Sequence, residues 1–329
     1  MSAPTIYDIA ARAGVGIATV SRVINGSRRV SDKTRGAVQQ AMDELGFRPN
    51  HAARRLAAGA PHRSRVVALM PFFTTAFYFS VCKAISKVLS EADTDFVLLD
   101  VHDQKDADRQ LDRLIAERSC EGVILCSMDL TEERHDQFST LKIPVVALDC
   151  NSKFVPHVRV DNEEGGRLLS QTLSTHGSQH QALILGTRGA LVFREREAGF
   201  RQVAPPSFRV FETENVDVAS GARIAEEILE SFPEVDGVAC VGDPLAIGAT
   251  KTLREHGRRV PQDVQVMGFD DQPLMAALGL TTIRQPMEEL GTWAADTIVR
   301  LISTPNGGPP QDLILPLEVI ERDTTGRLG

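Results

Sequence analysis

Short apolar runs that alternate with longer helical segments constrain this sequence more than any other feature. The alternation starts at residue 66, and the runs form two series, one before residue 150 and one after residue 180. Runs that are apolar nearly throughout are typical of parallel sheets that helices cover on both faces. The expected strands are 66–70, 96–99, 122–126, 145–148, 182–185, 209–211, 238–241 and 264–268. The sequence therefore predicts an α/β core of two doubly wound parallel-sheet lobes. A ligand is expected in a cleft between them, where strands end.

The first 25 residues have a different pattern, that of two short helices joined by a tight turn. Thr5 and Asp8 have the spacing of a capping box, and the apolar residues that follow fall on one helical face. The Gly-Val-Gly sequence of residues 14–16 interrupts this helix after about two turns, and a second helix is expected over residues 17–25. Two helices joined by such a glycine turn form a helix-turn-helix.

The second helix has two faces with different chemistry. One face carries a valine and isoleucine stripe that would pack on the first helix, and the other carries Ile17, Ala18, Ser21 and Arg22 and would enter a major groove. Arg22 is suited to a forked pair of hydrogen bonds with guanine, a contact that contributes about 1–3 kcal/mol of discrimination. Ile17 and Ala18 are suited to thymine methyl groups. The side chains suited to phosphate contacts are Thr19, Ser21 and Asn25.

The rest of the head adds a third helix, from the N-cap Ser31 to Leu45, and a basic segment from Asn50 to Gly59. That segment is about two turns long, which is marginal in water unless a partner packs against it. Residues 1–65 carry 11 Lys and Arg against 4 Asp and Glu, although the whole chain has a net charge of −8. A basic head on an acidic body is typical of a phosphate-binding module. We therefore expect a helix-turn-helix DNA-binding domain over 1–48, a hinge helix and linker over 49–65, and an effector-binding and dimerisation core over 66–329.

The head resembles the lactose-repressor/galactose-repressor (LacI/GalR) family. The motifs that carry the resemblance are Thr5-Ile-Tyr-Asp-Ile-Ala, Gly14-Val15, Ala18-Thr-Val-Ser-Arg-Val-Ile-Asn25, Val30-Ser31, Lys33-Thr-Arg35 and Phe47-Arg-Pro-Asn50. The resemblance implies a homodimer that reads the two half-sites of a pseudo-palindromic operator in double-stranded DNA. It also implies hinge helices, about residues 50–58, that order in the central minor groove, where Leu56 opens a base step. The implied DNA-binding residues are Thr5, Ile17, Ala18, Thr19, Ser21, Arg22, Asn25, Arg29, Asn50, Ala53 and Leu56.

The body resembles the same family, whose core is like a periplasmic sugar-binding protein. The matching motifs are Val160-Asp161-Asn162, Arg196 with Gly199-Phe200, Gly268-Phe269-Asp270-Asp271 and Gln285-Pro286. The resemblance implies a transcriptional regulator, read here as a repressor, whose operator affinity a small molecule modulates. Charged groups suit the hydroxyls of a sugar or sugar derivative, although Gly242 stands where the family commonly has Asn. The resemblance implies Asp149, Arg196 and Asp270 as effector contacts. Asp243 is predicted to bind the effector with them, and Phe73, Phe77 or Phe79 is suited to an apolar wall.

Two other classes of protein fit an α/β core: a hydrolase or dehydrogenase, and a ligand-sensing binding protein without a DNA role. The glycines at residues 14–16 follow a helix instead of a strand, and neither a phosphate-binding loop nor a Gly-x-Ser-x-Gly motif occurs, so no enzyme activity and no cofactor are expected. His176 and His180 are separated by a Gly-Ser loop, so no metal site is expected there.

The expected location of the protein depends on two kinds of segment that are not found in the sequence: a membrane-spanning run and a secretory signal. No apolar run approaches the roughly 18 residues needed to span a bilayer, and the N-terminus has no secretory pattern. Five scattered cysteines are typical of reduced thiols. The sequence therefore predicts a cytoplasmic protein, which argues against a transporter component.

Overall fold

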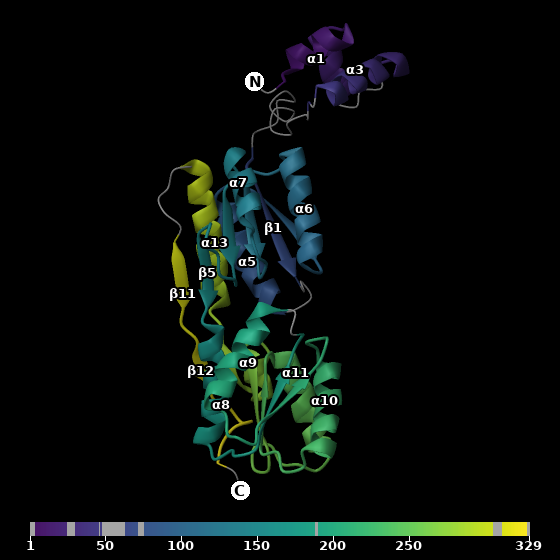
Figure 1. Ribbon diagram of the computed structural model, residues 1–329. Coiled ribbons are helices and arrows are strands. Elements are labelled where there is room, and N and C mark those ends of the chain that lie inside the picture. Colours follow the sequence, from purple (N-terminus) through teal and green to yellow (C-terminus); the bar gives the residue numbers. More distant parts are fainter. Residues whose placement is uncertain are drawn as a thin grey trace.

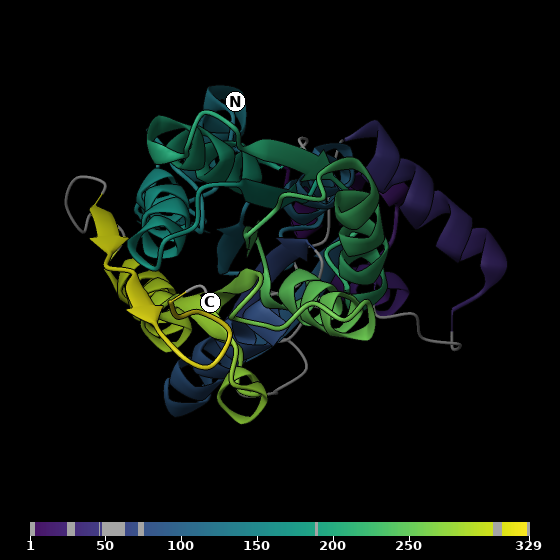
Figure 2. The same cartoon turned by 90° about the horizontal axis from the view of Figure 1, so that it is seen from below.

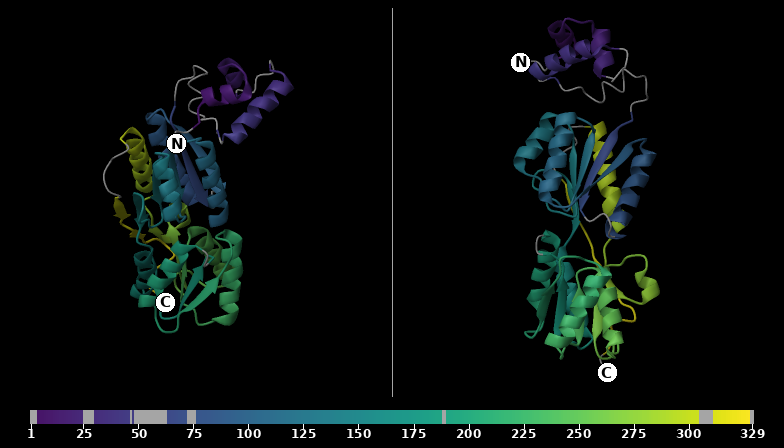
Figure 3. Two further views of the ribbon diagram at one scale, coloured as in Figure 1. Left: turned by 45° about the horizontal axis from the view of Figure 1, so that its top comes forward. Right: turned by 90° about the vertical axis from the view of Figure 1, so that its right-hand side faces the viewer.

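The computed structural model describes residues 4–24, 30–45, 47, 63–71, 76–187, 190–304 and 311–327. Figure 1 shows a small helical head beside the N-terminal lobe, at the end away from the C-terminal lobe. The right-hand view in Figure 3 shows the two lobes one above the other, each with a sheet between helices. In the described part of the chain, no helix is long and apolar enough to cross a membrane.

The described part of the head has three helices around a small apolar core. They are α1 (Ile6–Ala13), α2 (Ile17–Ile24) and α3 (Asp32–Glu44). The capping box is confirmed, because Thr5 and Asp8 each accept a hydrogen bond from the backbone N–H of the other. Gly14 ends α1 with a φ of 66°, a left-handed conformation that favours glycine. The fully or nearly fully buried side chains are Ile9, Ala10, Val20, Val23, Val38, Ala41 and Met42.

The N-terminal lobe has a six-stranded sheet in the order β11-β5-β4-β3-β1-β2, with all neighbours parallel. Its strands are β1 (Arg65–Pro71), β2 (Asp95–Val101), β3 (Gly122–Cys126), β4 (Val145–Leu148), β5 (His157–Val160) and β11 (Asp312–Leu315). Separate apolar cores lie on its two faces, one with α5 (Ala76–Glu91) and α13 (Met287–Ser303), the other with α6 (Gln104–Glu117) and α7 (Glu132–Thr140). Trp293 packs on the first of these cores.

The C-terminal lobe has a second six-stranded sheet in the order β12-β10-β9-β8-β6-β7, parallel except for the pair β10 and β12. Its strands are β6 (Gln181–Leu185), β7 (Arg209–Glu212), β8 (Gly237–Cys240), β9 (Gln265–Asp270), β10 (Thr281–Arg284) and β12 (Glu318–Ile320). Its helices are α8 (Asn162–Thr175), α9 (Leu191–Val203), α10 (Val218–Ser231), α11 (Asp243–Glu255) and the short α12 (Met275–Leu278). Figure 2 shows the teal pair α8 and α9 and the green pair α10 and α11 on opposite sides of the strands.

The chain crosses between the lobes three times: from β5 to α8, from β10 to α13 and from β11 to β12. Two doubly wound lobes are therefore confirmed, and the eight expected strands are present with ends shifted by at most two residues. Four strands were not predicted: β5, β10, β11 and β12. These include the edge strands β11 and β12, which the C-terminal segment supplies to each sheet in turn.

Candidate DNA-binding surface and effector site

Helix α2 has the two faces that its sequence predicts. Val20 and Val23 are buried against the other two helices, while Ile17, Ala18 and Arg22 are exposed. Ile17 exposes 43% of its surface although it is a large apolar residue. Thr19 and Ser21 are half-buried. The described part of the head thus presents an apolar and basic surface on one side of α2, which is the chemistry needed to contact base edges.

Helix α1 adds an exposed aromatic side chain that the sequence interpretation missed. Tyr7 exposes 67% of its surface, one residue after the start of the helix, and Thr5 is exposed at the N-cap. The signal was present, because the expected apolar stripe of this helix leaves Tyr7 off the packed face. The other residues predicted to bind DNA lie outside the described residues: Asn25, Arg29, Asn50, Ala53 and Leu56.

Three of the predicted effector residues, Asp149, Arg196 and Asp270, lie together where strands of both sheets end. Ser127 follows β3, Asp149 follows β4, and Asp270 is the last residue of β9. All three have positive φ angles, 50°, 55° and 111°, although none is glycine. Such backbone strain in non-glycine residues is uncommon and is concentrated at functional sites. The carboxyl ends of both parallel sheets therefore hold polar side chains in specific, strained positions.

Arg196 supplies the positive charge of this cluster and is 4% exposed. It lies on α9, where its Nε donates to Oδ1 of Asn162 at 2.9 Å and its Nη1 donates to the carbonyl oxygen of Val241 at 2.7 Å. Its guanidinium lies over the ring of Phe269, 3.6 Å from the centroid. Burial lowers the pKa of Arg196, and the nearby carboxylates of Asp270 and Asp149 oppose that shift. The guanidinium is held by contacts on its edge and on its face.

Two glycines set the position of α9 against α8. A Cβ atom at Gly199 would lie 1.8 Å from the carbonyl oxygen of Glu163, and one at Gly166 would lie 2.0 Å from the carbonyl oxygen of Arg196. Only glycine permits the backbones to approach so closely. The two helices therefore place Arg196 beside Asn162, the first residue of α8.

Asp149 is connected to Tyr78 through Ser127. The Ser127 hydroxyl donates to Oδ2 of Asp149 at 2.7 Å, so the Tyr78 hydroxyl, 2.7 Å from Ser127 Oγ, must donate to it. The second oxygen, Oδ1, is buried and accepts no hydrogen bond from the described residues. Burial raises the pKa of Asp149 to about 6, against the opposing effects of the Ser127 hydrogen bond and of Arg196.

Asp270 is held by two glutamines. Gln285 Nε2 donates to its Oδ1 at 2.7 Å, and Gln272 Nε2 lies 3.5 Å from its Oδ2. Burial raises the pKa of Asp270 to about 6, while Arg196 and the two glutamines lower it. The carbonyl oxygen of the Gln285 side chain is buried and accepts no hydrogen bond from the described residues.

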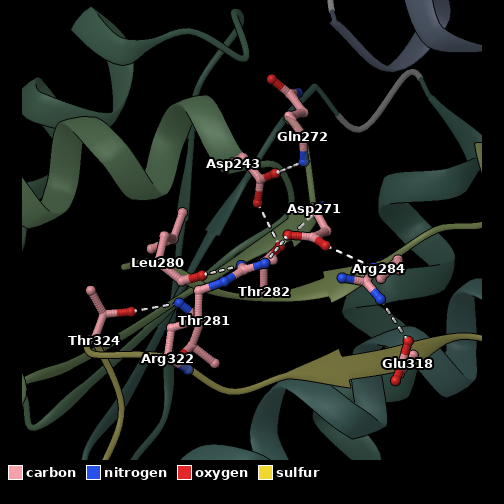
Figure 4. A network of polar contacts seen from close by, with 10 residues as sticks. All are labelled: Asp243, Asp271, Gln272, Leu280, Thr281, Thr282, Arg284, Glu318, Arg322 and Thr324. Atoms are coloured by element: carbon pink, nitrogen blue, oxygen red, sulfur yellow. Dashed lines mark hydrogen bonds and ion pairs between the residues drawn. The ribbon is translucent and has the colours of Figure 1, made fainter. Parts of the chain in front are cut away.

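Asp243, the fourth predicted effector residue, lies in a different setting (Figure 4). It is fully buried at the start of α11, where one carboxylate oxygen accepts from the backbone N–H of Gln272 at 2.8 Å and the other accepts from the Thr282 hydroxyl at 2.6 Å. Burial and the charge of Asp270 raise the pKa of Asp243. Both of its oxygens therefore bind the protein itself.

The segment after β9 is fixed by ion pairs as well. Asp271 accepts from Arg284 Nε at 2.8 Å and lies 2.8 Å from Nη2 of Arg322, and Arg284 also contacts Glu318 on β12 (Figure 4). Asp271 has a φ of 54°. These contacts join β9, β10 and β12 directly behind Asp270.

The aromatic residues near the start of α5 lie in separate environments. Phe77 is buried in the core of the N-terminal lobe, in an edge-to-face contact with Tyr78 at 5.0 Å between centroids. Phe79 exposes 62% of its surface, and Phe73 lies outside the described residues. Five polar residues of the described site were not predicted as effector contacts: Tyr78, Ser127, Asn162, Gln272 and Gln285. Asn162 and Gln285 stand in motifs that the sequence analysis had already singled out.

Both parts of the chain match known families. Residues 5–50 match the model described as bacterial regulatory proteins, lacI family, and residues 63–323 match the model described as periplasmic binding proteins and sugar binding domain of LacI family. In the described residues, no group of three or more His, Cys, Asp or Glu side chains is placed to hold a metal ion.

Curated relatives and solved structures match over almost the whole chain. The ribose operon repressor of Halalkalibacterium halodurans is 30% identical over 98% of this chain and 97% of that protein. The transcriptional regulator CelR of Thermobifida fusca is 33% identical over 98% of each. A structure of CelR in complex with cellobiose matches with a TM-score of 0.68 at 30% identity, covering 98% of this chain and 99% of that chain. The lac repressor dimer bound to operator and the anti-inducer ONPF matches with a TM-score of 0.70 at 26% identity, covering 99% and 100%. The chain belongs to the LacI family of bacterial regulatory proteins.

Proposed function

We propose that this chain represses transcription as a homodimer that presents two α2 helices to the half-sites of a pseudo-palindromic operator. The observation that carries the proposal is the division of α2, with Val20 and Val23 buried and Ile17, Ala18 and Arg22 exposed. The relatives are transcriptional regulators, and one solved relative is a dimer bound to its operator. Enzyme activity and a DNA-free binding role are therefore set aside, and the site of action is the cytoplasm, where bacterial DNA lies.

The DNA contacts are assigned as follows. Arg22 reads a guanine, Ile17 and Ala18 contact thymine methyl groups, and Thr5, Thr19 and Ser21 contact phosphates. Residues 49–65 serve as hinge and linker, with Leu56 in the minor groove. The remaining contacts come from Asn25, Arg29, Asn50 and Ala53.

A small-molecule effector binds where the two lobes meet, with Asp149, Arg196 and Asp270 as its contacts. These side chains come from both lobes and are buried, and Asp149 has an oxygen that no described residue satisfies. Relatives include a ribose operon repressor and a regulator solved with cellobiose, which supports a sugar or sugar derivative. We assign Asp243 a supporting role in this site, because its oxygens hold the segment that carries Asp270.

Effector binding controls DNA binding through the lobes. A ligand that contacts both lobes stabilises one arrangement of them, and the N-terminal lobe is the part of the core to which the hinge segment connects. A tenfold to hundredfold preference for one arrangement corresponds to about 1.4–2.7 kcal/mol of coupling at each site.

Selection of duplexes from a random library with the full chain tests the DNA role. We expect enrichment of pseudo-palindromic sites and an affinity that falls steeply with salt concentration, because phosphate contacts release counterions. A failure to enrich any sequence at low ionic strength would contradict the proposal. Sedimentation of the protein with the selected duplex then gives the number of chains per operator, with two expected.

A further inference from the structure

Two hydrogen-bond acceptors at the effector site have no donor among the described residues: Oδ1 of Asp149 and Oε1 of Gln285. Both side chains are at least 96% buried. A buried acceptor without a donor costs about 1–3 kcal/mol, so native proteins rarely retain one without a partner from outside.

The orientation of the Gln285 amide is fixed by its neighbour. Asp270 Oδ1, 2.7 Å away, accepts hydrogen bonds, so the group that faces it must be the NH₂ group of Gln285. The atom left without a partner is therefore the carbonyl oxygen. Both unsatisfied groups of the site require a donor.

Part of the Arg196 guanidinium is already engaged by the described residues. Two of the three nitrogens of Arg196 donate to Asn162 and to Val241, and the face of the guanidinium is covered by Phe269. Phosphate and carboxylate ligands are bound best by two parallel N–H groups of an arginine fork. Because Nε donates to Asn162, the fork that Nε forms with Nη2 is closed to an anion, whereas Nη2 and the second N–H group of Nη1 remain for a ligand.

Among the described residues, three carboxylates surround Arg196, and one further arginine, Arg159, interacts with one of them, Glu195. The carboxylates of Asp149 and Asp270 interact with its charge, and Glu195 contacts the other side of Asn162 at 3.3 Å. Burial is the main cause of the raised pKa values of Asp149 and Asp270, and burial also disfavours any further negative charge at this position. Another buried anion would add to a cost that is already present.

We propose that the effector is an uncharged polyhydroxyl compound whose hydroxyls donate to Asp149 and Gln285, and that phosphorylated or carboxylated sugars are rejected. This inference rests on the proposed effector site between the lobes. Hydroxyl groups fit because each can donate to Asp149 or Gln285 and accept from an N–H group of Arg196 that is still free.

The first test compares two Asp→Asn variants in the protein without added ligand. The substitution Asp149→Asn removes a buried charge that lacks a full set of hydrogen-bond donors. Asn also tolerates the left-handed backbone at this position, so the variant should melt at a higher temperature than the parent. The matched control is Asp236→Asn, because the Asp236 carboxylate accepts from the backbone N–H groups of Gln179 and His180 at 2.9 Å each. That variant should melt at a lower temperature than the parent. If Asp149→Asn were destabilised as much as Asp236→Asn, the proposal would be overturned.

The second test uses pairs of sugars that differ only in charge. The probes are ribose against ribose 5-phosphate, cellobiose against cellobionate, and glucose against glucose 6-phosphate, each added to the full chain in a thermal-shift assay. For any scaffold that binds, we expect the anionic member to bind at least about tenfold more weakly. An anion that binds as well as its neutral parent contradicts the proposal, and if no scaffold binds, the Asp149→Asn comparison decides.

A gel shift with the selected operator separates this inference from the proposed function. Release of the operator by a phosphorylated sugar, but not by its neutral parent, would refute the proposed rejection of charged sugars. It would leave the regulator role intact. Failure to bind any operator would refute the regulator role itself.

Discussion

The carboxylate of Asp243 accepts a hydrogen bond of 2.8 Å from the backbone N–H of Gln272, two residues beyond Asp270. Its other oxygen accepts from the Thr282 hydroxyl on the neighbouring strand β10. A carboxylate whose two oxygens both bind the protein thus fixes the segment in which Asp270 adopts a φ of 111°. The shape of the effector site depends on a buried group behind it.

We predict that Asp243→Ala weakens the response to effector while operator binding without effector persists. The substitution leaves the Gln272 N–H and the Thr282 hydroxyl without an acceptor, which costs about 1–3 kcal/mol and frees the segment that holds Asp270. Thermal melting and effector titration of the operator complex measure the two effects. Asp296→Ala, at an exposed carboxylate on α13, is the control and should behave as the parent. A normal effector response in Asp243→Ala would rule out the supporting role.

Arg22→Ala should relax the base preference at one symmetric pair of operator positions. The exposed guanidinium on α2 is the group suited to a forked contact with guanine, and its loss should cost about 1–3 kcal/mol of discrimination. Selection from randomised duplexes gives the preference at every position. Arg113→Ala, at an arginine on α6 that pairs with Glu117, is the matched control. An unchanged preference in Arg22→Ala would show that another residue reads these bases.

Gly199→Ala should destabilise the C-terminal lobe and displace Arg196. The added methyl group would meet the carbonyl oxygen of Glu163 at 1.8 Å, so α9 must move away from α8, at a cost of about 1–3 kcal/mol. In contrast, Gly36→Ala on α3 meets no atom within 4 Å and should stabilise its helix by about 0.5–1 kcal/mol. Chemical denaturation measures both changes, and two variants of equal stability would contradict the close contact of α8 and α9.

The stability difference between Asp149→Asn and the parent should depend on pH. Folding raises the pKa of Asp149 from 3.8 to about 6, so its neutral form stabilises the fold fully below about pH 4, and this contribution is lost as the pH rises through about 6. The Asn variant cannot ionise at this position. Its advantage in melting temperature should therefore be largest above about pH 7 and disappear near pH 4. A difference that stays constant over this range would show that the carboxyl group does not titrate as described.

Sequence patterns predicted the interior of this fold better than its edges. Buried strands such as 122–126 and 145–148 are apolar throughout, so their periodicity identifies them. The strand at 312–315 alternates between exposed and half-buried residues, and its position in the sheet depends on pairing with residues 157–160 far away in the chain. Such long-range pairing leaves little trace in a local pattern.

The family resemblance predicted part of the arrangement of residues at the proposed effector site. Asp149, Arg196 and Asp270 meet as expected because the ends of parallel strands converge. The unsatisfied oxygen of Asp149 and the fixed amide of Gln285 depend on side-chain hydrogen bonds across the site, which no sequence spacing encodes. The prediction for Asp243 gave the correct end of the sheet. That both of its carboxylate oxygens bind the protein depends on the three-dimensional arrangement, which the sequence does not show.

The order in which the chain supplies its strands bears on its synthesis. Helix α13 and strand β11, which complete the N-terminal lobe, come from residues 287–315, whereas the DNA-binding helices leave the ribosome first. A nascent chain thus carries an exposed head long before its first lobe can close. Paired recognition of an operator must wait until α13 and β11 have been translated, and a product that terminates before residue 287 would retain the head without a complete N-terminal lobe.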